Sequence, residues 1–236
     1  MRGHTATNIL NENRESYDRM AKEFSGTREH FWEELTFLKE YANPDMRVLD
    51  IGCGNGRFYS VLKERNAVYT GVDNSKGLLA EAKTKYPEAN FVEGDATALP
   101  FADGSFDIAY SFAVVHHIPG KALREKFFSE AARVLRPGGT LIVTSWYLWR
   151  PRYVLRLITE ALKSLLFISP LDIGDMMYTF GKDRHSRYLH AFTHRGLLRL
   201  MRKNGFAIIG SEIVGRTGSS GEKNILVVAR KRISLS

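Results

Sequence analysis

Residues 48–56, with the sequence Val-Leu-Asp-Ile-Gly-Cys-Gly-Asn-Gly, run from an apolar segment into a turn that is rich in glycine. The apolar residues 48–51 predict a buried strand, and a helix is predicted to follow at 58–63. Glycines at 52, 54 and 56 permit a tight turn and let a ligand approach the backbone closely. Ligands of open parallel sheets bind beyond the carboxyl ends of the strands, so this turn is a candidate binding site.

The spacing of the glycines distinguishes this turn from a loop that binds dinucleotides. A dinucleotide loop reads Gly-x-Gly-x-x-Gly and faces a pyrophosphate with a helix N-terminus, whereas this turn reads Gly-x-Gly-x-Gly. Asp50 precedes it, and a carboxylate there would repel a pyrophosphate. The same carboxylate suits a ligand with a cationic amino group, such as the methionine portion of S-adenosylmethionine. The alternative is a strand, turn and helix that serve the fold alone.

Two further acids follow predicted strands. Asp73 comes after the strand at 68–72, about 20 residues beyond the turn, where a carboxylate meets ribose hydroxyls in nucleoside-binding α/β folds. Asp95 follows the strand at 91–93 and is placed to accept a hydrogen bond from an adenine amino group, with the backbone of Ala96 beside it. A single Asp is more often a turn residue or a helix cap. Three acids at the ends of three consecutive strands favour a binding site.

Strands and helices alternate as far as residue 146. Further strands are predicted at 106–111 and 140–146, with helices at 78–85 and 122–135. This alternation indicates a parallel α/β sheet with helices on both faces. Closer to the C-terminus, a helix is predicted at 196–204, and strands at 207–214 and 224–230 around a loop at 218–221 predict an antiparallel hairpin.

Two segments flank the predicted core. Residues 12–43 are predicted to be helical, in two parts separated at 25–27. Residues 147–192 are interpreted as an insertion, a lid or substrate-facing element, with an amphipathic helix at 153–168 followed by a polar stretch. The whole chain, 1–236, has the length of a single domain.

Composition limits the classes of partner and site. The chain has 34 Lys and Arg against 26 Asp and Glu, a formal charge of +8. This balance favours nucleic acid, acidic metabolites or a membrane surface as partners, unless the basic residues are merely solvated. The single cysteine, Cys53, excludes an intramolecular disulfide, and no metal site is predicted. There is no apolar segment long enough for a membrane span and no apolar signal core in the polar N-terminal sequence, so a cytoplasmic location is expected.

Four motifs together resemble the class I S-adenosylmethionine-dependent methyltransferases. They are Asp-Ile-Gly-Cys-Gly-Asn-Gly at 50–56, Gly-Val-Asp at 71–73, Gly-Asp-Ala-x-x-Leu-Pro-Phe at 94–101 and Arg-Val-Leu-Arg-Pro-Gly-Gly at 133–139. The resemblance implies S-adenosylmethionine as cofactor and a Rossmann-like, doubly wound α/β fold with a seven-stranded sheet whose last strand is antiparallel. The residues it implies for cofactor binding are Tyr17, Asp50, Gly52, Cys53, Gly54, Gly56, Asp73, Asn74, Asp95, Ala96, Ser111 and Phe112.

Flanking motifs resemble, more narrowly, the tRNA wobble-uridine methyltransferases that esterify 5-carboxymethyluridine. They are Tyr-Asp-x-x-Ala-x-x-Phe-Ser-x-Thr-Arg at 17–28, Ser-Phe-Ala-Val-Val-His-His at 111–117, Ser-Trp at 145–146 and Arg-Tyr-Leu-His-Ala-Phe at 187–192. The resemblance implies catalytic roles around the substrate base and its carboxylate for Arg28, His116, Trp146 and Arg187. It also implies tRNA as a partner and, as in related eukaryotic enzymes, a small zinc-containing activator subunit.

The chemistry of these residues is compatible with such a reaction. A carboxylate is ionised at neutral pH and needs no general base, so catalysis would rest on positioning and desolvation. Arg28 and Arg187 are candidates to hold the carboxylate, and Trp146 is a candidate to stack on a flipped base. The alternatives are a core tryptophan, arginines in surface ion pairs, and a loop pair without chemistry at His116 and His117.

Two other functions remain open. A methyltransferase for a small quinone- or lipid-like acceptor fits the apolar helix at 153–168, and the core motifs alone also fit ubiquinone and menaquinone biosynthesis methyltransferases. A non-catalytic cofactor-binding subunit would be expected to have lost the acids or glycines of the turn, which are intact in this chain.

Overall fold

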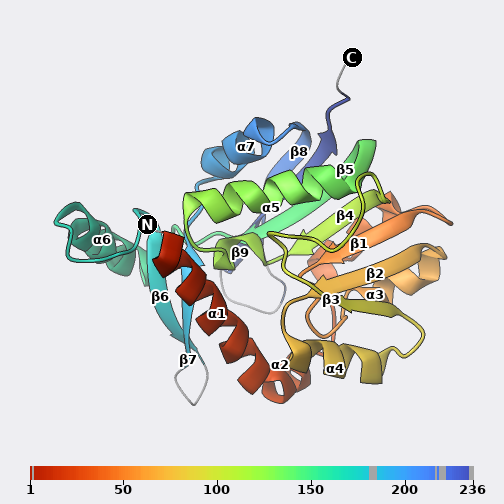
Figure 1. Cartoon of the computed structure of the whole chain (residues 1–236), viewed down its shortest axis with the longest axis horizontal. Helices are drawn as coiled ribbons and strands as arrows, with labels where there is room; N and C mark the ends of the chain where they lie inside the picture. The colour runs from red at the N-terminus through yellow and green to blue at the C-terminus, as the bar shows by residue number, and fades with distance from the viewer. Residues whose placement is uncertain (2, 181–184, 216, 218–221, 234–236) are drawn as a thin grey trace.

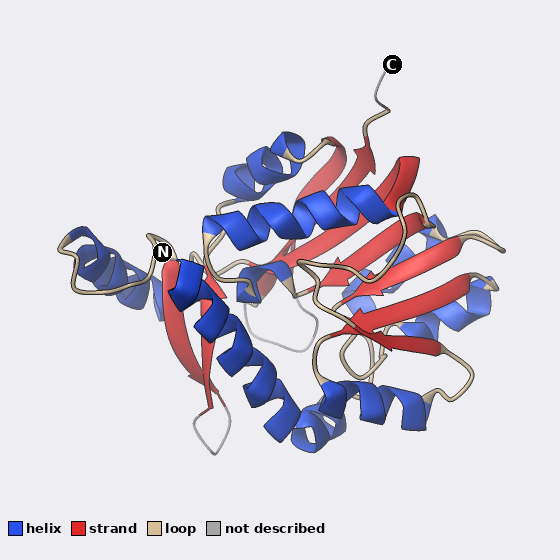
Figure 2. Cartoon of the chain, viewed as in Figure 1, coloured by secondary structure: helices blue, strands red, loops and turns tan. Residues whose placement is uncertain are grey.

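A seven-stranded sheet lies at the centre of the structure (Figure 1, Figure 2), a computed structural model that describes residues 1, 3–180, 185–215, 217 and 222–233. The strand order is β3-β2-β1-β4-β5-β9-β8. The strands are β1 (Arg47–Ile51), β2 (Val68–Asp73), β3 (Asn90–Glu93), β4 (Phe106–Phe112), β5 (Leu135–Trp146), β8 (Phe206–Gly215) and β9 (Lys223–Lys231). Pairing is parallel from β3 to β5, and β9 runs antiparallel to β5 and β8. The predicted fold class is confirmed.

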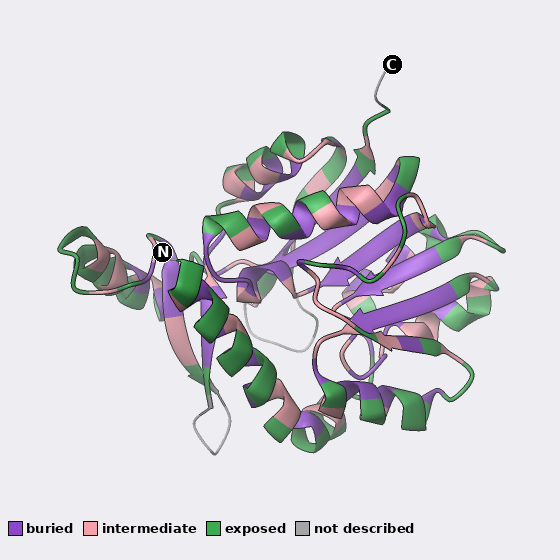
Figure 3. Ribbon diagram, in the orientation of Figure 1, coloured by how far each residue is buried: buried purple, intermediate pink, exposed green. Residues whose placement is uncertain are grey.

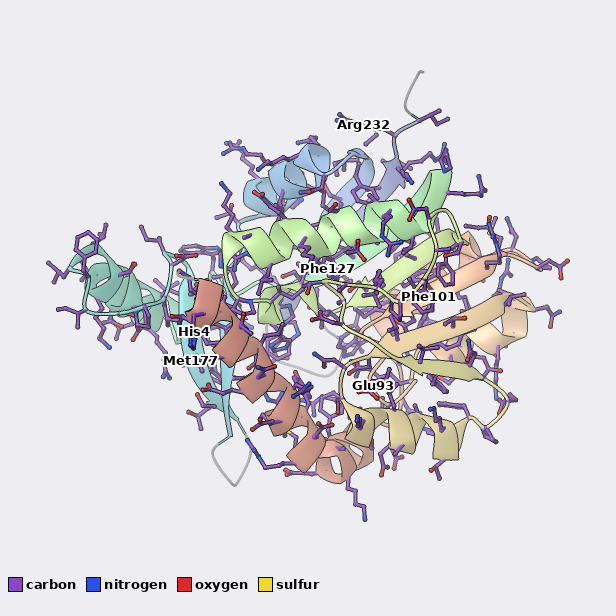
Figure 4. All side chains as sticks on the ribbon, in the orientation of Figure 1. His4, Glu93, Phe101, Phe127, Met177 and Arg232 are labelled. Carbon is purple, nitrogen blue, oxygen red and sulfur yellow. The ribbon has the colours of Figure 1, made fainter. Side chains whose placement is uncertain are left out.

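Helices cover both faces of the sheet because successive strand residues point to opposite sides. Leu49 lies in a buried cluster with Phe127, which Figure 4 labels on the helix crossing the near face of the sheet. Val48 belongs to a second cluster on the other face, with Leu79. In Figure 3 the central strands form a buried layer between these two clusters. The covering elements are α3 (Tyr59–Leu62), α4 (Lys76–Lys85), α5 (Lys121–Val134), α7 (His194–Lys203), and the 3-10 helices η2 (Lys63–Arg65) and η3 (Val115–His117).

The C-terminal hairpin is confirmed as β8 and β9, and the loop predicted at 218–221 lies outside the described residues. β5 is longer than predicted. It begins at Leu135 rather than at residue 140, because Leu135 pairs with Phe106 of β4 before the register shifts. Proline and glycine normally lie outside strands, so the Pro-Gly-Gly sequence at 137–139 predicted a strand that starts only after it.

The N-terminal segment is helical from Gly3, ahead of the predicted start at residue 12. Its elements are α1 (Gly3–Arg19), α2 (Ala21–Thr27) and the 3-10 helix η1 (Glu33–Tyr41). The buried positions of α1 have helical spacing, but two of the four are polar, so hydrophobic periodicity did not reveal the first turns. These positions are Ala6, Ile9, Asn13 and Ser16. α1 lies along β7 (Figure 1).

The segment 147–192 contains a helix, α6 (Pro151–Leu165), and a two-stranded sheet of β6 (Asp175–Phe180) and β7 (His185–His190). This hairpin lies where only a polar stretch was predicted, so that prediction was wrong. Tyr188 packs with Ile9 of α1, and Leu189 packs in a cluster with α6. Because both faces of β7 are covered, it lacks the alternation of polar and apolar residues that marks a half-exposed strand.

Candidate active site

A cavity opens at the carboxyl ends of β1 to β4, which is where parallel sheets bind ligands. Its opposite wall comes from α1, α2 and β7, so segments that are far apart in the sequence meet there (Figure 1). The predicted residues that line it are Tyr17, Arg28, Asp50, Gly52, Cys53, Gly54, Asp73, Asn74, Asp95, Ala96, Phe112, Trp146 and Arg187. The fold therefore gathers most of the candidate residues at one place, although their individual roles stay predictions.

The glycine turn is held against β2 by backbone hydrogen bonds. The amides of Gly52 and Cys53 donate to the carbonyl of Val72 at 2.7 and 3.1 Å. The amide of Gly54 donates to Oδ2 of Asp73 at 2.9 Å. All three glycines have a positive φ, +74° at Gly52, +57° at Gly54 and +72° at Gly56. Such values favour glycine, so the spacing of the motif follows from the backbone path of the turn.

Replacing Gly52 by alanine is expected to destabilise the fold by about 3 kcal/mol, from strain at positive φ and from overpacking. A Cβ there would lie 2.3 Å from Cγ2 of Val114. Gly54→Ala is the matched control, because its nearest neighbour, Cδ1 of Leu78, would be 3.9 Å away. It is expected to cost only the φ strain, about 1 kcal/mol. Chemical denaturation of the two variants measures the difference, and equal losses would show that Val114 yields without cost.

Three acids at the carboxyl ends of β1, β2 and β3 all reach the cavity wall: Asp50 within β1, Asp73 at the end of β2 and Asp95 just beyond β3. Asp50 is 2% exposed and accepts a hydrogen bond from the Tyr69 hydroxyl at 3.0 Å. Burial raises the pKa of Asp50 to about 7, despite this hydrogen bond. Burial also raises the pKa of Asp73, whose Oδ1 accepts the amide of Ser75 at 2.9 Å. Asp95 accepts both the amide and the hydroxyl of Thr97, at 2.7 and 2.8 Å.

This set of donors and acceptors fits the predicted cofactor. A buried carboxylate whose charge is disfavoured, as at Asp50, is a suitable partner for a ligand's ammonium group. Asp73 sits where ribose hydroxyls meet a carboxylate in this class of fold, and its oxygens retain acceptor positions beyond the two amide bonds. The turn between the two acids presents backbone at Gly52 and Gly54, which leaves room for a bound molecule.

Aromatic and cationic side chains form the opposite end of the cavity. The guanidinium of Arg187, a residue only 2% exposed, lies 4.5 Å from the ring centre of Tyr17 and donates to its hydroxyl at 3.4 Å. The Tyr17 hydroxyl is also 3.1 Å from Nε2 of His117, whose Nδ1 lies 3.1 Å from the carbonyl of Tyr188. That carbonyl can only accept, so Nδ1 carries the proton and Nε2 accepts from Tyr17. Burial, reinforced by the charge of Arg187, lowers the pKa of His117 to about 4.

Two more arginines lie over aromatic rings at the wall. The guanidinium carbon of Arg28 is 4.4 Å from the ring centre of Phe24, and that of Arg57 is 4.0 Å from the ring centre of Trp32. All four side chains, with the exposed Arg14 of α1, belong to residues that line the cavity. Cation–π contacts orient both guanidinium groups. This part of the cavity wall therefore carries positive charge against flat apolar surfaces.

Three of the predicted site residues, His116, Ser111 and Gly56, are not among the residues that line the cavity. His116 is fully buried behind Trp146, with its ring 4.9 Å from the Trp146 ring and its Nδ1 3.4 Å from the Trp146 amide. Ser111 points into the sheet and donates to the carbonyl of Ile51 at 3.1 Å. Gly56 serves the turn, because a Cβ there would lie 2.8 Å from Phe91. These three residues support the site from behind.

Other residues at the wall were missed by sequence reasoning. They include Asn13, Asn55, Arg57 and His117. His117 is adjacent to the predicted His116. No feature of the sequence indicates which of two neighbouring histidines on a 3-10 turn faces the cavity. Asn13 donates to the His117 carbonyl at 3.1 Å and accepts the Tyr188 amide at 3.1 Å. Asn13 shares a face of α1 with the apolar Ala6 and Ile9, and a polar residue on such a face is the signal that could have pointed to its role.

Comparison with known sequences places residues 49–143 in the family described as methyltransferase domain. A protein of Encephalitozoon cuniculi named as a methyltransferase is 34% identical over 82% of this chain and 86% of its own length. Demethylmenaquinone methyltransferase of Beutenbergia cavernae is 35% identical over 61% of this chain and 58% of its own. The tRNA (carboxymethyluridine(34)-5-O)-methyltransferase ALKBH8 of Mus musculus is 35% identical over 55% of this chain but only 19% of its own.

Solved structures share the fold at lower identity. The S-adenosylmethionine-dependent methyltransferase of Methanosarcina mazei has a TM-score of 0.74 and 22% identity, covering 86% of this chain and 99% of that one. A chain from the complex between the Haloferax volcanii Trm112 methyltransferase activator and a methyltransferase has a TM-score of 0.67 and 17% identity, covering 94% and 98%. These likenesses establish the architecture of the sheet and its helices.

Proposed function

The chain belongs to the class I S-adenosylmethionine-dependent methyltransferases, and from this premise we propose that it methylates the carboxylate of 5-carboxymethyluridine at the wobble position of tRNA. The observation that carries the proposal is the place of Arg187, a buried guanidinium in the same cavity as the acids at the carboxyl ends of β1, β2 and β3. A cation in a site shielded from water favours an anionic acceptor over a neutral one. The mouse relative, by its name, acts on carboxymethyluridine in tRNA.

S-adenosylmethionine is the cofactor of this family and supplies a methyl group activated by its sulfonium. In this chain, Asp50 would pair with the amino group of the cofactor and Asp73 with its ribose hydroxyls. Asp95 and the backbone of Ala96 would face the adenine. Phe112, Cys53 and Asn74 also line this end of the cavity and would enclose the same molecule.

The acceptor would lie between Arg187 and Trp146. A guanidinium holds a carboxylate through two parallel hydrogen bonds, and the flat indole offers a stacking surface to the uracil ring. The carboxylate brings no proton to remove, so a neutral His117 whose Nε2 already accepts from Tyr17 need not act as a base. Catalysis would come from alignment and exclusion of water. Arg28, at the mouth, would contact the carboxylate or a phosphate.

Nucleoside mass spectrometry tests the acceptor. The protein would be incubated with S-adenosylmethionine and either tRNA carrying 5-carboxymethyluridine or the same tRNA with unmodified uridine. We expect the methyl ester of carboxymethyluridine in the first and no new methylated nucleoside in the second. The proposal fails if the first tRNA gains no ester in the presence of active, cofactor-binding protein.

Cofactor affinity is expected to fall as the pH decreases below about 7. The folded protein holds the pKa of Asp50 at about 7, so near neutral pH much of it is ionised and below that it is protonated. Because the amino cation pairs with the ionised form, each pH unit below 7 should weaken binding about tenfold until the pKa of the bound state is reached. Isothermal titration of S-adenosylmethionine between pH 5 and 8, compared with Asp50→Asn, measures the effect. If cofactor affinity depends on pH in the same way in the Asp50→Asn variant, a group other than Asp50 is responsible for the dependence.

A second candidate is methyl transfer to a small quinone-like acceptor. The cavity wall is rich in aromatic rings, including Phe24, Phe31, Phe58 and Phe112, and the Beutenbergia relative is by its name a demethylmenaquinone methyltransferase. A hydroxylated ring would need a base, and His117 is the neutral imidazole in the cavity. Transfer of labelled methyl to a demethylated quinol, with none to carboxymethyluridine tRNA, would favour this candidate.

We also propose that a small activator subunit covers the edge strand β8, which ends the sheet order. Ile209 and Ile213 of β8 are 55% and 43% exposed, so this edge strand offers apolar side chains to a partner. Purification with and without a coexpressed activator, followed by sizing and methyl transfer, tests this. Ile213→Glu should release the activator without lowering cofactor affinity. The predicted cytoplasmic location agrees with tRNA as substrate and stays a prediction.

A further inference from the structure

One face of α6 exposes an apolar stripe that the fold leaves uncovered. Leu155, Ile158, Leu162 and Leu165 follow one another at spacings of three and four, so they share one side of the helix. Their exposed fractions are 72%, 51%, 55% and 61%. The other side of α6, with Tyr153 and Leu157, is buried against β6 and β7. α6 therefore has two apolar sides, of which the fold uses one. Figure 3 shows the helix projecting from the body with much of its surface exposed.

The apolar surface continues beyond the end of the helix. Leu166, Phe167 and Ile168 are 68%, 95% and 70% exposed. With the four residues of the stripe they form the α6 surface, defined as Leu155, Ile158, Leu162, Leu165, Leu166, Phe167 and Ile168. Isolated exposed apolar residues are ordinary, but a contiguous group of large aliphatic and aromatic side chains marks an interaction site.

Basic side chains flank this surface along one side. Arg152, Arg156 and Lys163 are exposed and lie about a third of a helical turn from the apolar stripe. Arg152 is held in place by hydrogen bonds from its Nε and Nη2 to the Tyr178 hydroxyl, at 3.1 and 2.7 Å. The acid on α6, Glu160, is paired with Lys163 at 2.8 Å. The three cations outnumber this one acid, so the flank of α6 has a net positive charge.

We propose that the α6 surface docks the protein on anionic phospholipid membranes. A helix that joins an apolar stripe to a row of Lys and Arg lies in the plane of the membrane interface, with its apolar side chains at the acyl boundary and its cations at the phosphates. The projecting Phe167 suits a soft lipid phase, and the positive flank is complementary to anionic headgroups. None of the helices among the described residues has the length and apolarity of a membrane span.

Cosedimentation of the full chain with vesicles tests this without any cofactor or methyl acceptor, so its result is separate from that of the proposed function. We expect binding to vesicles of phosphatidylcholine with phosphatidylglycerol, and weaker binding to phosphatidylcholine alone. Leu155→Gln with Leu162→Gln should lower the partition coefficient by about tenfold or more. The matched control, Phe37→Gln with Val68→Thr, changes residues that are 48% and 57% exposed elsewhere and should leave it unchanged.

The charged flank supplies a second arm of the test. Arg156→Gln and Lys163→Gln should each weaken binding to the anionic vesicles about fivefold, whereas Lys83→Gln on α4 should not. Absence of binding to anionic vesicles overturns the proposal. If the apolar variant instead dissociates a dimer in analytical ultracentrifugation, the occupant is a second copy of the chain. If the flank variants instead weaken tRNA binding, the occupant is RNA.

Discussion

Asp73→Ala is expected to weaken S-adenosylmethionine binding about 100-fold, because the substitution removes the two charge-assisted hydrogen bonds that Asp73 is proposed to make to the ribose. It also releases the amides of Gly54 and Ser75, which the carboxylate now holds at 2.9 Å each. The turn would therefore lose its tie to the end of β2. Isothermal titration of S-adenosylmethionine and of S-adenosylhomocysteine measures the loss, which should be similar for the two because they share the ribose.

Glu93→Gln is the matched control for this prediction. Glu93 is paired with Asp73 in the β2–β3 register and is labelled in Figure 4 at the carboxyl end of β3, outside the set of residues that line the cavity. The cofactor affinity of the Glu93→Gln variant should stay within about twofold of that of the unsubstituted protein. If Asp73→Ala binds the cofactor as well as Glu93→Gln does, the assignment of Asp73 to the ribose is wrong.

Arg187→Met is expected to lower kcat/KM for carboxymethyluridine tRNA about 100- to 1000-fold, since it removes the cation proposed to hold the acceptor carboxylate. Methionine has a similar length and would pack near Met20, which the Arg187 guanidinium contacts. Cofactor affinity should change little, because Arg187 lies on β7, across the cavity from the glycine turn. Arg187→Lys keeps the charge without the planar fork and should recover only part of the activity.

A measurement besides activity separates this role from a structural one. The charge of Arg187 contributes to the low pKa of His117, after burial. Arg187→Met should therefore raise the pKa of His117 above about 4, which titration of the histidine signals by NMR would detect. Full activity on carboxymethyluridine tRNA with this raised pKa would contradict the proposed role of Arg187 in holding the substrate.

The central sheet and the cofactor side of the site were predictable because their signals are local. The glycine turn needs positive φ at Gly52 and Gly54, and only glycine adopts it without strain, so the motif reports the backbone directly. Asp50 and Asp73 lie at the carboxyl ends of strands that are recognisable as apolar runs, and parallel strands bring these ends to one edge of the sheet. Each inference needed only a few neighbouring residues and the topology of the fold class.

The acceptor side was less predictable because it depends on contacts between distant segments. Arg187 reaches the cavity from the β6–β7 hairpin, which hydrophobic patterning does not predict because a charged residue occupies a buried position in it. Arg187 contacts Tyr17, which lies 170 residues earlier in the sequence. The choice between His116 and His117 depends on which way a 3-10 turn faces, and the pattern of residues there does not show it. The packing of α1 against η3 and β7 likewise depends on hydrogen bonds between Asn13 and the backbone of His117 and Tyr188. Hydrophobic periodicity does not predict such polar contacts.

The chemical stability of the transferred methyl group tests the central claim most directly. Carboxymethyluridine tRNA would be incubated with the protein and S-adenosylmethionine labelled in the methyl group, and then treated with mild alkali. The account predicts that label enters the tRNA and is released as methanol by alkali, because an ester hydrolyses there. Label that remains on the RNA after alkali, or a failure of label to enter the tRNA while a quinol accepts it, would contradict methyl transfer to a carboxylate.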